Sequence, residues 1–102
     1  MNERPIPDAA RRDPDAVEML RMWIAEEKLF CSMKVGMYTD STEIPESRAW
    51  GVMLADAARH IAMAMEEKYV IPREKTLQEI QRAFVQQLAS PASPASGQFA
   101  YD

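Results

Sequence analysis

The sequence predicts a small α+β protein in which a β-hairpin is followed by two helices, in the order ββαα. Three observations predict this class. Apolar residues between positions 20 and 35 alternate with a period of two, which is typical of strands. From about residue 47 they recur at helical spacing, and a Ser/Thr-x-x-Glu pattern at residues 76–79 marks the start of a second helix. With 102 residues, 47% of them hydrophobic, the chain has room for one small domain.

The predicted hairpin is expected to have one apolar and one mixed face, because alternate residues of a strand point to opposite sides. The polar sequence AEEK at residues 25–28 forms its turn, without the Asn-Gly or Asp-Gly pair that favours tight hairpins. A helix over residues 16–28 is the alternative, since Asp15 could cap it. The alternating apolar residues are Leu20, Met22, Ile24, Leu29, Cys31, Met33 and Val35.

A long helix is predicted from Glu46 or Ser47 to about Tyr69, where the sequence VIPRE ends it. Its apolar positions recur at helical spacing and predict a buried stripe. Glycine costs about 1 kcal/mol relative to alanine inside a helix, so close backbone approach is expected at Gly51. The stripe comprises Trp50, Leu54, Ala57, Ile61, Ala64 and Lys68, and Met53 and Met65 widen it.

The second helix is predicted to begin at a capping box formed by Thr76 and Glu79. One apolar face follows at helical spacing. Its residues are Leu77, Ile80, Phe84 and Leu88, with Ala83 and Val85 beside them.

The two ends differ from the middle in composition. Residues 1–15 hold three prolines and mixed charge, and residues 90–102 are rich in Ala, Ser and Pro. Such segments cannot bury enough apolar surface to offset the entropy of ordering. The sequence therefore predicts a flexible N-terminal segment (1–15), a single α+β domain (16–89) and a flexible tail (90–102).

Self-association is expected from the small number of strands. A two-stranded sheet is marginal and leaves two exposed edges, and a domain of about 75 residues is often marginal alone. The sequence thus predicts a homodimer in which a twofold axis completes the sheet. Exchange of hairpins between the two chains is a variant of this dimer. The alternative is that the sheet edge is offered to a different protein.

Several classes of function are disfavoured by the composition. A net charge of −4 and a pI near 5.0 argue against nucleic-acid binding, which needs clustered Lys and Arg. No uninterrupted apolar run predicts a membrane span. The lone thiol of Cys31 and the polar N-terminus predict a cytoplasmic protein. One histidine and one cysteine do not supply metal-ligand spacing, and no cofactor motif is present, so neither a metal nor a cofactor is predicted.

Asp56 and His60 are the one pair that could do acid–base chemistry. Side chains four residues apart on a helix are neighbours, and a carboxylate can orient an imidazole. The sequence indicates no nucleophile beside them, so no catalytic residue is predicted and a local contact is the preferred interpretation. The alternative is a small-molecule binding protein or minor enzyme with a pocket near Trp50, Asp56 and His60.

Trp23 and Phe30 fall on opposite strands of the predicted hairpin. If they share the outer sheet face, they form an exposed apolar patch, which would mark an interface. The sequence therefore favours a non-enzymatic interaction or accessory homodimer whose Trp23/Phe30 surface, or whose proline-rich tails, contact a protein partner.

One segment has a family resemblance. The sequence WGVMLADAARHIAMAM, placed after LRMWIAEEKLFCSMKVG, resembles a family of small proteobacterial proteins known only as a domain of unknown function. The likeness runs from about residue 16 to 88, and its most specific part is the helix motif Trp-Gly-x-x-Leu-Ala-Asp-x-Ala-Arg-His at residues 50–60. The resemblance implies a small α+β protein and no activity, so it assigns no site residue.

Overall fold

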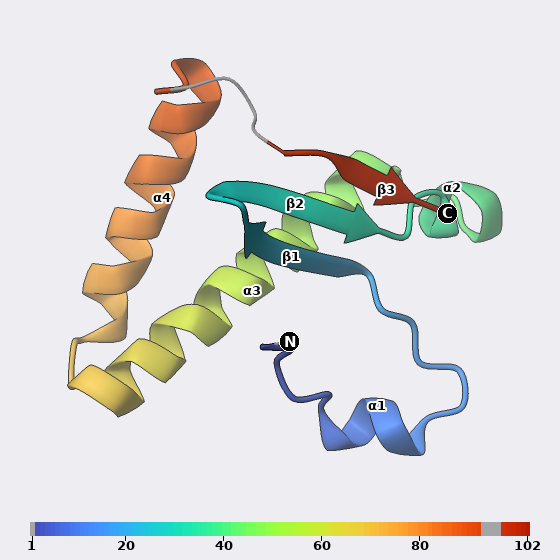
Figure 1. Cartoon of the computed structure of the whole chain (residues 1–102), viewed down its shortest axis with the longest axis horizontal. Coiled ribbons are helices and arrows are strands. Elements are labelled where there is room, and N and C mark those ends of the chain that lie inside the picture. The colour runs from blue at the N-terminus through green and yellow to red at the C-terminus, as the bar shows by residue number, and fades with distance from the viewer. Residues whose placement is uncertain (1, 93–96) are drawn as a thin grey trace. The chain divides into compact units, whose positions relative to one another are not determined.

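A computed structural model describes residues 2–92 and 97–102. Its strand pair followed by two long helices confirms the predicted α+β class and the ββαα core order. The chain divides between Val35 and Gly36 into a sheet unit, which includes the C-terminal strand, and a helical unit. The elements are α1 (Asp8–Arg12), β1 (Leu20–Ala25), β2 (Lys28–Met33), α2 (Met37–Ser41), α3 (Glu46–Tyr69), α4 (Arg73–Ala89) and β3 (Phe99–Tyr101) (Figure 1).

The hairpin forms as predicted, with β1 antiparallel to β2. Its two turn residues, Glu26 and Glu27, have positive φ angles of 53° and 62°. This pair of left-handed residues matches the twist of the flanking strands, so a tight turn forms without Asn-Gly. The alternative helix over residues 16–28 is wrong, since β1 occupies residues 20–25.

A third strand lies in the segment that the sequence predicted as a flexible tail. β3 pairs parallel with β2 to give the sheet order β1-β2-β3, and the Cys31 amide donates a 3.2 Å hydrogen bond to the Gln98 carbonyl. β2 is therefore central, and one of the two edges expected to be open is covered by the chain itself. A three-residue strand is too short for its periodicity to be recognised. Residues 93–96 of the predicted tail lie outside the described residues.

The N-terminal segment also contains structure. α1 is a single turn of helix within the predicted flexible region, of which Met1 lies outside the described residues. Arg21 of β1 binds the carboxylates of Glu3 at 2.7 Å and Glu18 at 2.6 Å. These contacts are exposed ion pairs, which stabilise a fold only weakly.

The long helix is confirmed, but the capping box is wrong. α4 begins at Arg73 after Pro72, so Thr76 lies inside its first turn. The Thr76 hydroxyl is buried and has no hydrogen-bond partner among the described residues. Proline is common at helix starts, and here it sets the boundary three residues before the sequence signature. Glu79, instead of capping, forms an exposed ion pair with Arg82.

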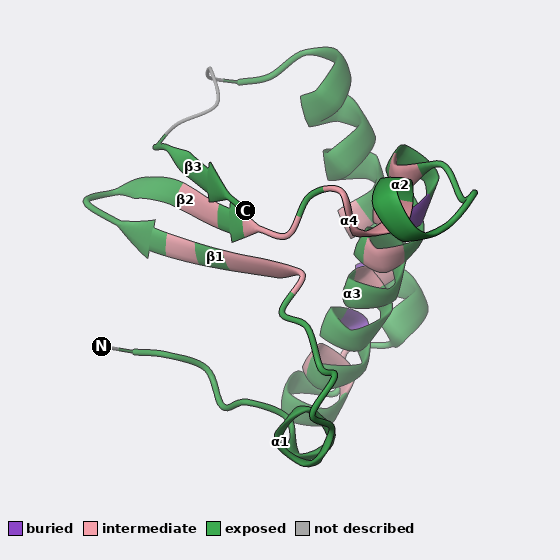
Figure 2. Cartoon of the chain, turned by 90° about the vertical axis from the view of Figure 1, so that its right-hand side faces the viewer, coloured by how far each residue is buried: buried purple, intermediate pink, exposed green. Residues whose placement is uncertain are grey.

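The core of the described chain is very small. Its buried apolar residues are Ala49 and Ala62, joined by the polar Thr76, and no large side chain is fully buried (Figure 2). α3 packs against α4 within the helical unit. The covered side of α3 near α4 is built from Ala58, Ala62 and Met65, whose small members allow close helix approach.

The predicted buried stripe of α3 is wrong for the single chain. Leu54 is 38% exposed and Ile61 is 50% exposed. Ala57, Ala64 and Lys68 are also exposed, whereas Trp50, Met53 and Met65 are half-buried. Because α3 carries apolar residues on more than one side, periodicity cannot determine which side α4 covers.

The structure differs from two further predictions about the helices. A Cβ added at Gly51 would meet no atom within 4 Å, so no close backbone approach explains this glycine. On α4 the predicted apolar face is covered only near the turn, where Leu77 and Ile80 are half-buried, while Phe84 is 49% and Leu88 is 71% exposed.

Candidate interaction surfaces

One face of the sheet is apolar throughout. Residues opposite one another in neighbouring strands project from the same side of a sheet. Met22 pairs with Cys31, and Cys31 pairs in turn with Phe99 of β3. The register places eight side chains together, which we call the apolar sheet face: Leu20, Met22, Ile24, Leu29, Cys31, Met33, Phe99 and Tyr101.

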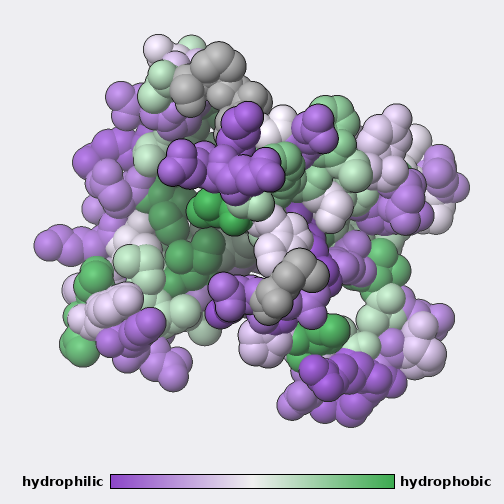
Figure 3. All heavy atoms as spheres, in the orientation of Figure 1, coloured by the Kyte–Doolittle hydropathy of each residue, from purple (hydrophilic) through white to green (hydrophobic). Residues whose placement is uncertain are grey.

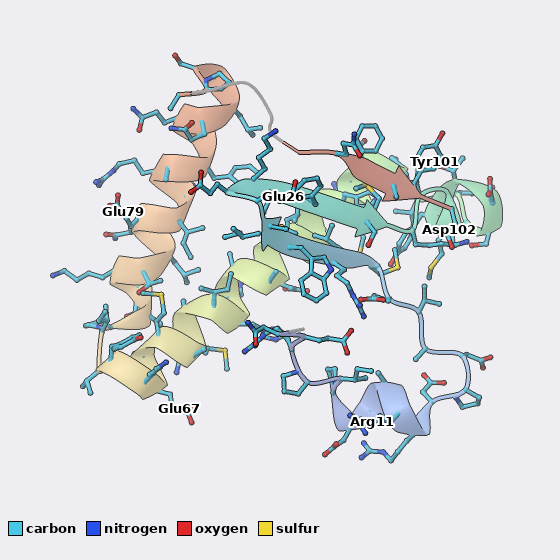
Figure 4. The ribbon with its side chains drawn as sticks, in the orientation of Figure 1. Arg11, Glu26, Glu67, Glu79, Tyr101 and Asp102 are labelled. Carbon is cyan, nitrogen blue, oxygen red and sulfur yellow. The ribbon has the colours of Figure 1, made fainter. Side chains whose placement is uncertain are left out.

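This face is largely open to solvent. Ile24 is 82% exposed, Phe99 71% and Tyr101 69%. The Phe99 and Tyr101 rings stack on each other with centroids 6.3 Å apart, and Tyr101 lies at the C-terminal end of the chain (Figure 4). Aromatic side chains carry large apolar areas, so these two rings form a substantial part of the exposed apolar surface of this face.

Trp23 and Phe30 lie on the opposite face of the sheet. They are direct partners across β1 and β2, so they share a face, as the interaction hypothesis required. Both are half-buried, and the Arg21 guanidinium lies 5.9 Å from the centroid of the Trp23 ring. The more exposed apolar surface is therefore the face that Trp23 and Phe30 do not occupy. The strand alternation contained this information, since it placed Met22 and Ile24 together.

The three residues of the alternative pocket make separate local contacts. Asp56 accepts a 2.9 Å hydrogen bond from Arg59, so its hydrogen-bond partner is Arg59 and not His60. His60 is exposed. Trp50 donates its indole N–H to Glu46 at 3.3 Å.

Two open depressions lie on the helical unit, and none of these three residues lines either of them. Gln78 and Arg82 of α4 line both depressions, and the second also includes Met65 and Ile71. Within the described residues, no group of three or more His, Cys, Asp or Glu side chains could hold a metal ion.

Glu46 is a helix-capping residue that the sequence did not predict. Its carboxylate accepts hydrogen bonds from the backbone amides of Gly36 at 2.6 Å, Tyr38 at 3.0 Å and Thr39 at 3.1 Å, as well as from the Trp50 indole. These amides are the free donors at the start of α2, where a negative charge is stabilising. The Gly36 amide is the main cause that lowers the pKa of Glu46, and partial desolvation opposes it. The first residue of α3 thereby caps α2.

Glu66 does the same for α4. Its carboxylate accepts hydrogen bonds from the Arg73 backbone amide at 3.0 Å and from the guanidinium at 3.0 and 2.8 Å. The guanidinium is the main cause that lowers the pKa of Glu66, and the Arg73 amide adds to it. Both carboxylates are engaged with the backbone of their own chain, so we assign them structural roles.

The structure is that of a small α+β protein with exposed apolar surfaces. Among the residues that the structure describes, no helix has the length and apolar character needed to cross a bilayer. The chain belongs to the family described as a domain of unknown function, DUF5076, whose profile matches residues 3–92. This confirms the expected resemblance to a family without an assigned function.

A solved structure shows the same fold. It comes from a photosynthetic Rhodopseudomonas bacterium and is provisionally named a pyruvate dehydrogenase. The two chains are 23% identical with a TM-score of 0.66, over 95% of this chain and 93% of that one. At this identity the likeness shows the fold alone. A comparison with curated proteins finds no match.

Proposed function

We propose that this chain is a non-enzymatic interaction or accessory protein that works as a homodimer. The observation that carries the proposal is the contrast, within the described residues, between a buried apolar core of two alanines and the large apolar side chains left exposed on the sheet and on α3. Burial of apolar surface stabilises a protein by about 25 cal/mol per Å². Many large apolar side chains of the single chain stay exposed, and burial against a second chain would provide this stabilisation. Figure 3 shows hydrophobic side chains, in green, at the surface of the chain.

The sheet unit supplies the surface for a protein partner. The apolar sheet face offers large side chains, and in the part of the chain that the structure describes β1 is an edge strand of the order β1-β2-β3. An unpaired edge can accept a strand from another chain. The Trp23/Phe30 face is the second part of this surface, with the Arg21 guanidinium 5.9 Å from the centroid of the Trp23 ring.

Sedimentation of the full chain over a range of concentrations tests the homodimer. We expect a dimer at micromolar concentration, and a monomer that persists at high micromolar concentration overturns the proposal.

Ile24→Ser, compared with the exposed helix substitution Val52→Ser, then tests the sheet surface. We expect Ile24→Ser alone to abolish capture of a co-purifying protein while the fold is retained. Small-molecule stabilisation that is lost in His60→Ala would instead support the pocket.

A further inference from the structure

We propose that two copies of the chain pair through α3 in antiparallel orientation, along a seam formed by Leu54, Ala57, Ile61 and Ala64. This inference rests on the proposed homodimer and names its pairing element. We call these four residues the α3 seam.

The α3 seam has the spacing of a coiled-coil contact. Its residues are separated by three, four and three positions, which is the a/d repeat that keeps one side of a helix facing another helix. All four are exposed in the single chain, with Leu54 at 38% and Ile61 at 50%. The less exposed residues in this part of α3 are Ala58, Ala62 and Met65, and they lie on a different side of the helix from the centre of the seam.

The seam is complementary to itself. A twofold axis at the level of Arg59 lies midway between Leu54 and Ala64, and also midway between Ala57 and Ile61. Antiparallel pairing about this axis places each large side chain of one copy against an alanine of the other. Interdigitated large and small residues fill the space between two helices. Parallel pairing would place large side chains on one another and alanine on alanine, which leaves alternate clashes and gaps.

The residues that flank the seam at its two ends are also matched by this twofold axis. Trp50 is level with Lys68 of the second copy, because the two positions are also equidistant from Arg59. An ammonium group is attracted to the face of an indole ring. Within its own chain the Lys68 ammonium lies 5.4 Å from the centroid of the Tyr69 ring, which is a contact of the same kind. Antiparallel pairing also sets the two helix dipoles in opposition, which is favourable.

Cross-linking of cysteine variants tests the proposal directly. In a Cys31→Ser background, one preparation carries Leu54→Cys and another carries Ala64→Cys. The two are mixed and treated with a short thiol-reactive cross-linker. The matched control is Val52→Cys with Met63→Cys, because these residues are similarly exposed but lie on another side of α3.

We expect a mixed product of the 54 and 64 variants and none from the control pair. Neither seam variant should cross-link with itself, since equal positions in an antiparallel pair would be about 15 Å apart along the axis at 1.5 Å per residue. A product of the 54 variant with itself overturns the antiparallel arrangement.

A second measurement separates failure of the seam from failure of the homodimer. Ile61→Asp should weaken self-association by roughly tenfold or more, because it buries a charge in the seam, whereas Val52→Asp should not. A dimer that persists in Ile61→Asp and gives no 54–64 product overturns the seam and leaves the homodimer standing. A wild-type chain that sediments as a monomer overturns both.

Discussion

The Glu66 carboxylate and Arg73 are joined by three hydrogen bonds across the turn between α3 and α4. One comes from the first backbone amide of α4 and two from the guanidinium, so a single side chain fixes both the start of the helix and its first residue. The turn between them contains Val70 at a positive φ of 60°, an unfavourable conformation for a β-branched residue. The Glu66–Arg73 contact holds this strained connection in place.

The first prediction concerns that contact. Glu66→Gln should lower the urea midpoint of unfolding. The carboxylate accepts the guanidinium at Oε1 and the Arg73 backbone amide at Oε2, whereas a glutamine amide has a single acceptor oxygen and no charge. The neighbouring Glu67→Gln is the control, since the Glu67 side chain points away from α4 (Figure 4). Equal midpoints for the two variants would show that the contact has no stabilising role.

A pH prediction follows from the lowered pKa of Glu46. Its ordinary value is 4.5, and amide hydrogen bonds, first that of Gly36, lower it in the folded chain. The charged form is therefore favoured by folding. Its stabilising contribution is present above about pH 4.5 and is lost as pH falls through the lower folded-state value.

Glu46→Gln should consequently lose less stability on acidification than the wild-type chain does. Urea unfolding at pH 7 and at about pH 3 measures the difference, with Glu43→Gln of the preceding exposed loop as the control. A Glu46→Gln chain with the same acid dependence as the wild type would contradict the capping role.

Alanine substitutions at the two glycines of the helical unit should change the stability of the fold in opposite directions. Gly36 has a φ of 104°, and a Cβ there would lie 3.1 Å from the Asp40 carboxylate, so Gly36→Ala should destabilise by about 1–2 kcal/mol. Gly51 is inside α3 with open space around it, so Gly51→Ala should stabilise by up to about 1 kcal/mol. Thermal unfolding of both variants checks the two signs. Destabilisation by Gly51→Ala would indicate that a second chain approaches that position closely.

Ala62 is the most buried residue of the described chain, with no exposed surface. Ala62→Leu should destabilise by about 1–3 kcal/mol, because added methylene groups have no space between α3 and α4. The control is Ala55→Leu, an exposed position of the same helix. Chemical denaturation measures both, and equal stabilities would mean that α4 can move away at little cost.

The sequence predicted the elements whose signal is long and local. Period-two alternation located the β1–β2 hairpin, and helical spacing with a proline stop located α3. β3 was not predicted, because three residues held by a distant strand carry almost no local signal. The start of α4 was misplaced because the signature at Thr76 competes with Pro72, which lies earlier in the chain.

The candidate surfaces were predicted less well, for a related reason. The aromatic residues Trp23 and Phe30 predicted the interaction surface, yet strand register places the more exposed apolar residues on the other face of the sheet. The two capping carboxylates, Glu46 and Glu66, could not be recognised because their partners lie in other elements. The stripe predicted to be buried on α3 is largely exposed in the single chain, because its pattern does not say which side of the helix α4 covers.

The last prediction concerns attachment of the C-terminal strand. Gly97 has a φ of 75°, and a Cβ there would lie 2.1 Å from the Leu29 carbonyl oxygen, closer than any real contact allows. Gly97→Ala should therefore detach β3 from β2 while β1 and β2 stay paired. Amide exchange at Cys31, whose N–H is bonded to Gln98, should accelerate strongly, whereas the Trp23 and Phe30 amides should change little. Unchanged protection of the Cys31 amide would show that β3 does not depend on this close approach. If β3 does detach, the freed edge of β2 should also increase concentration-dependent self-association, which sedimentation of the same variant would detect.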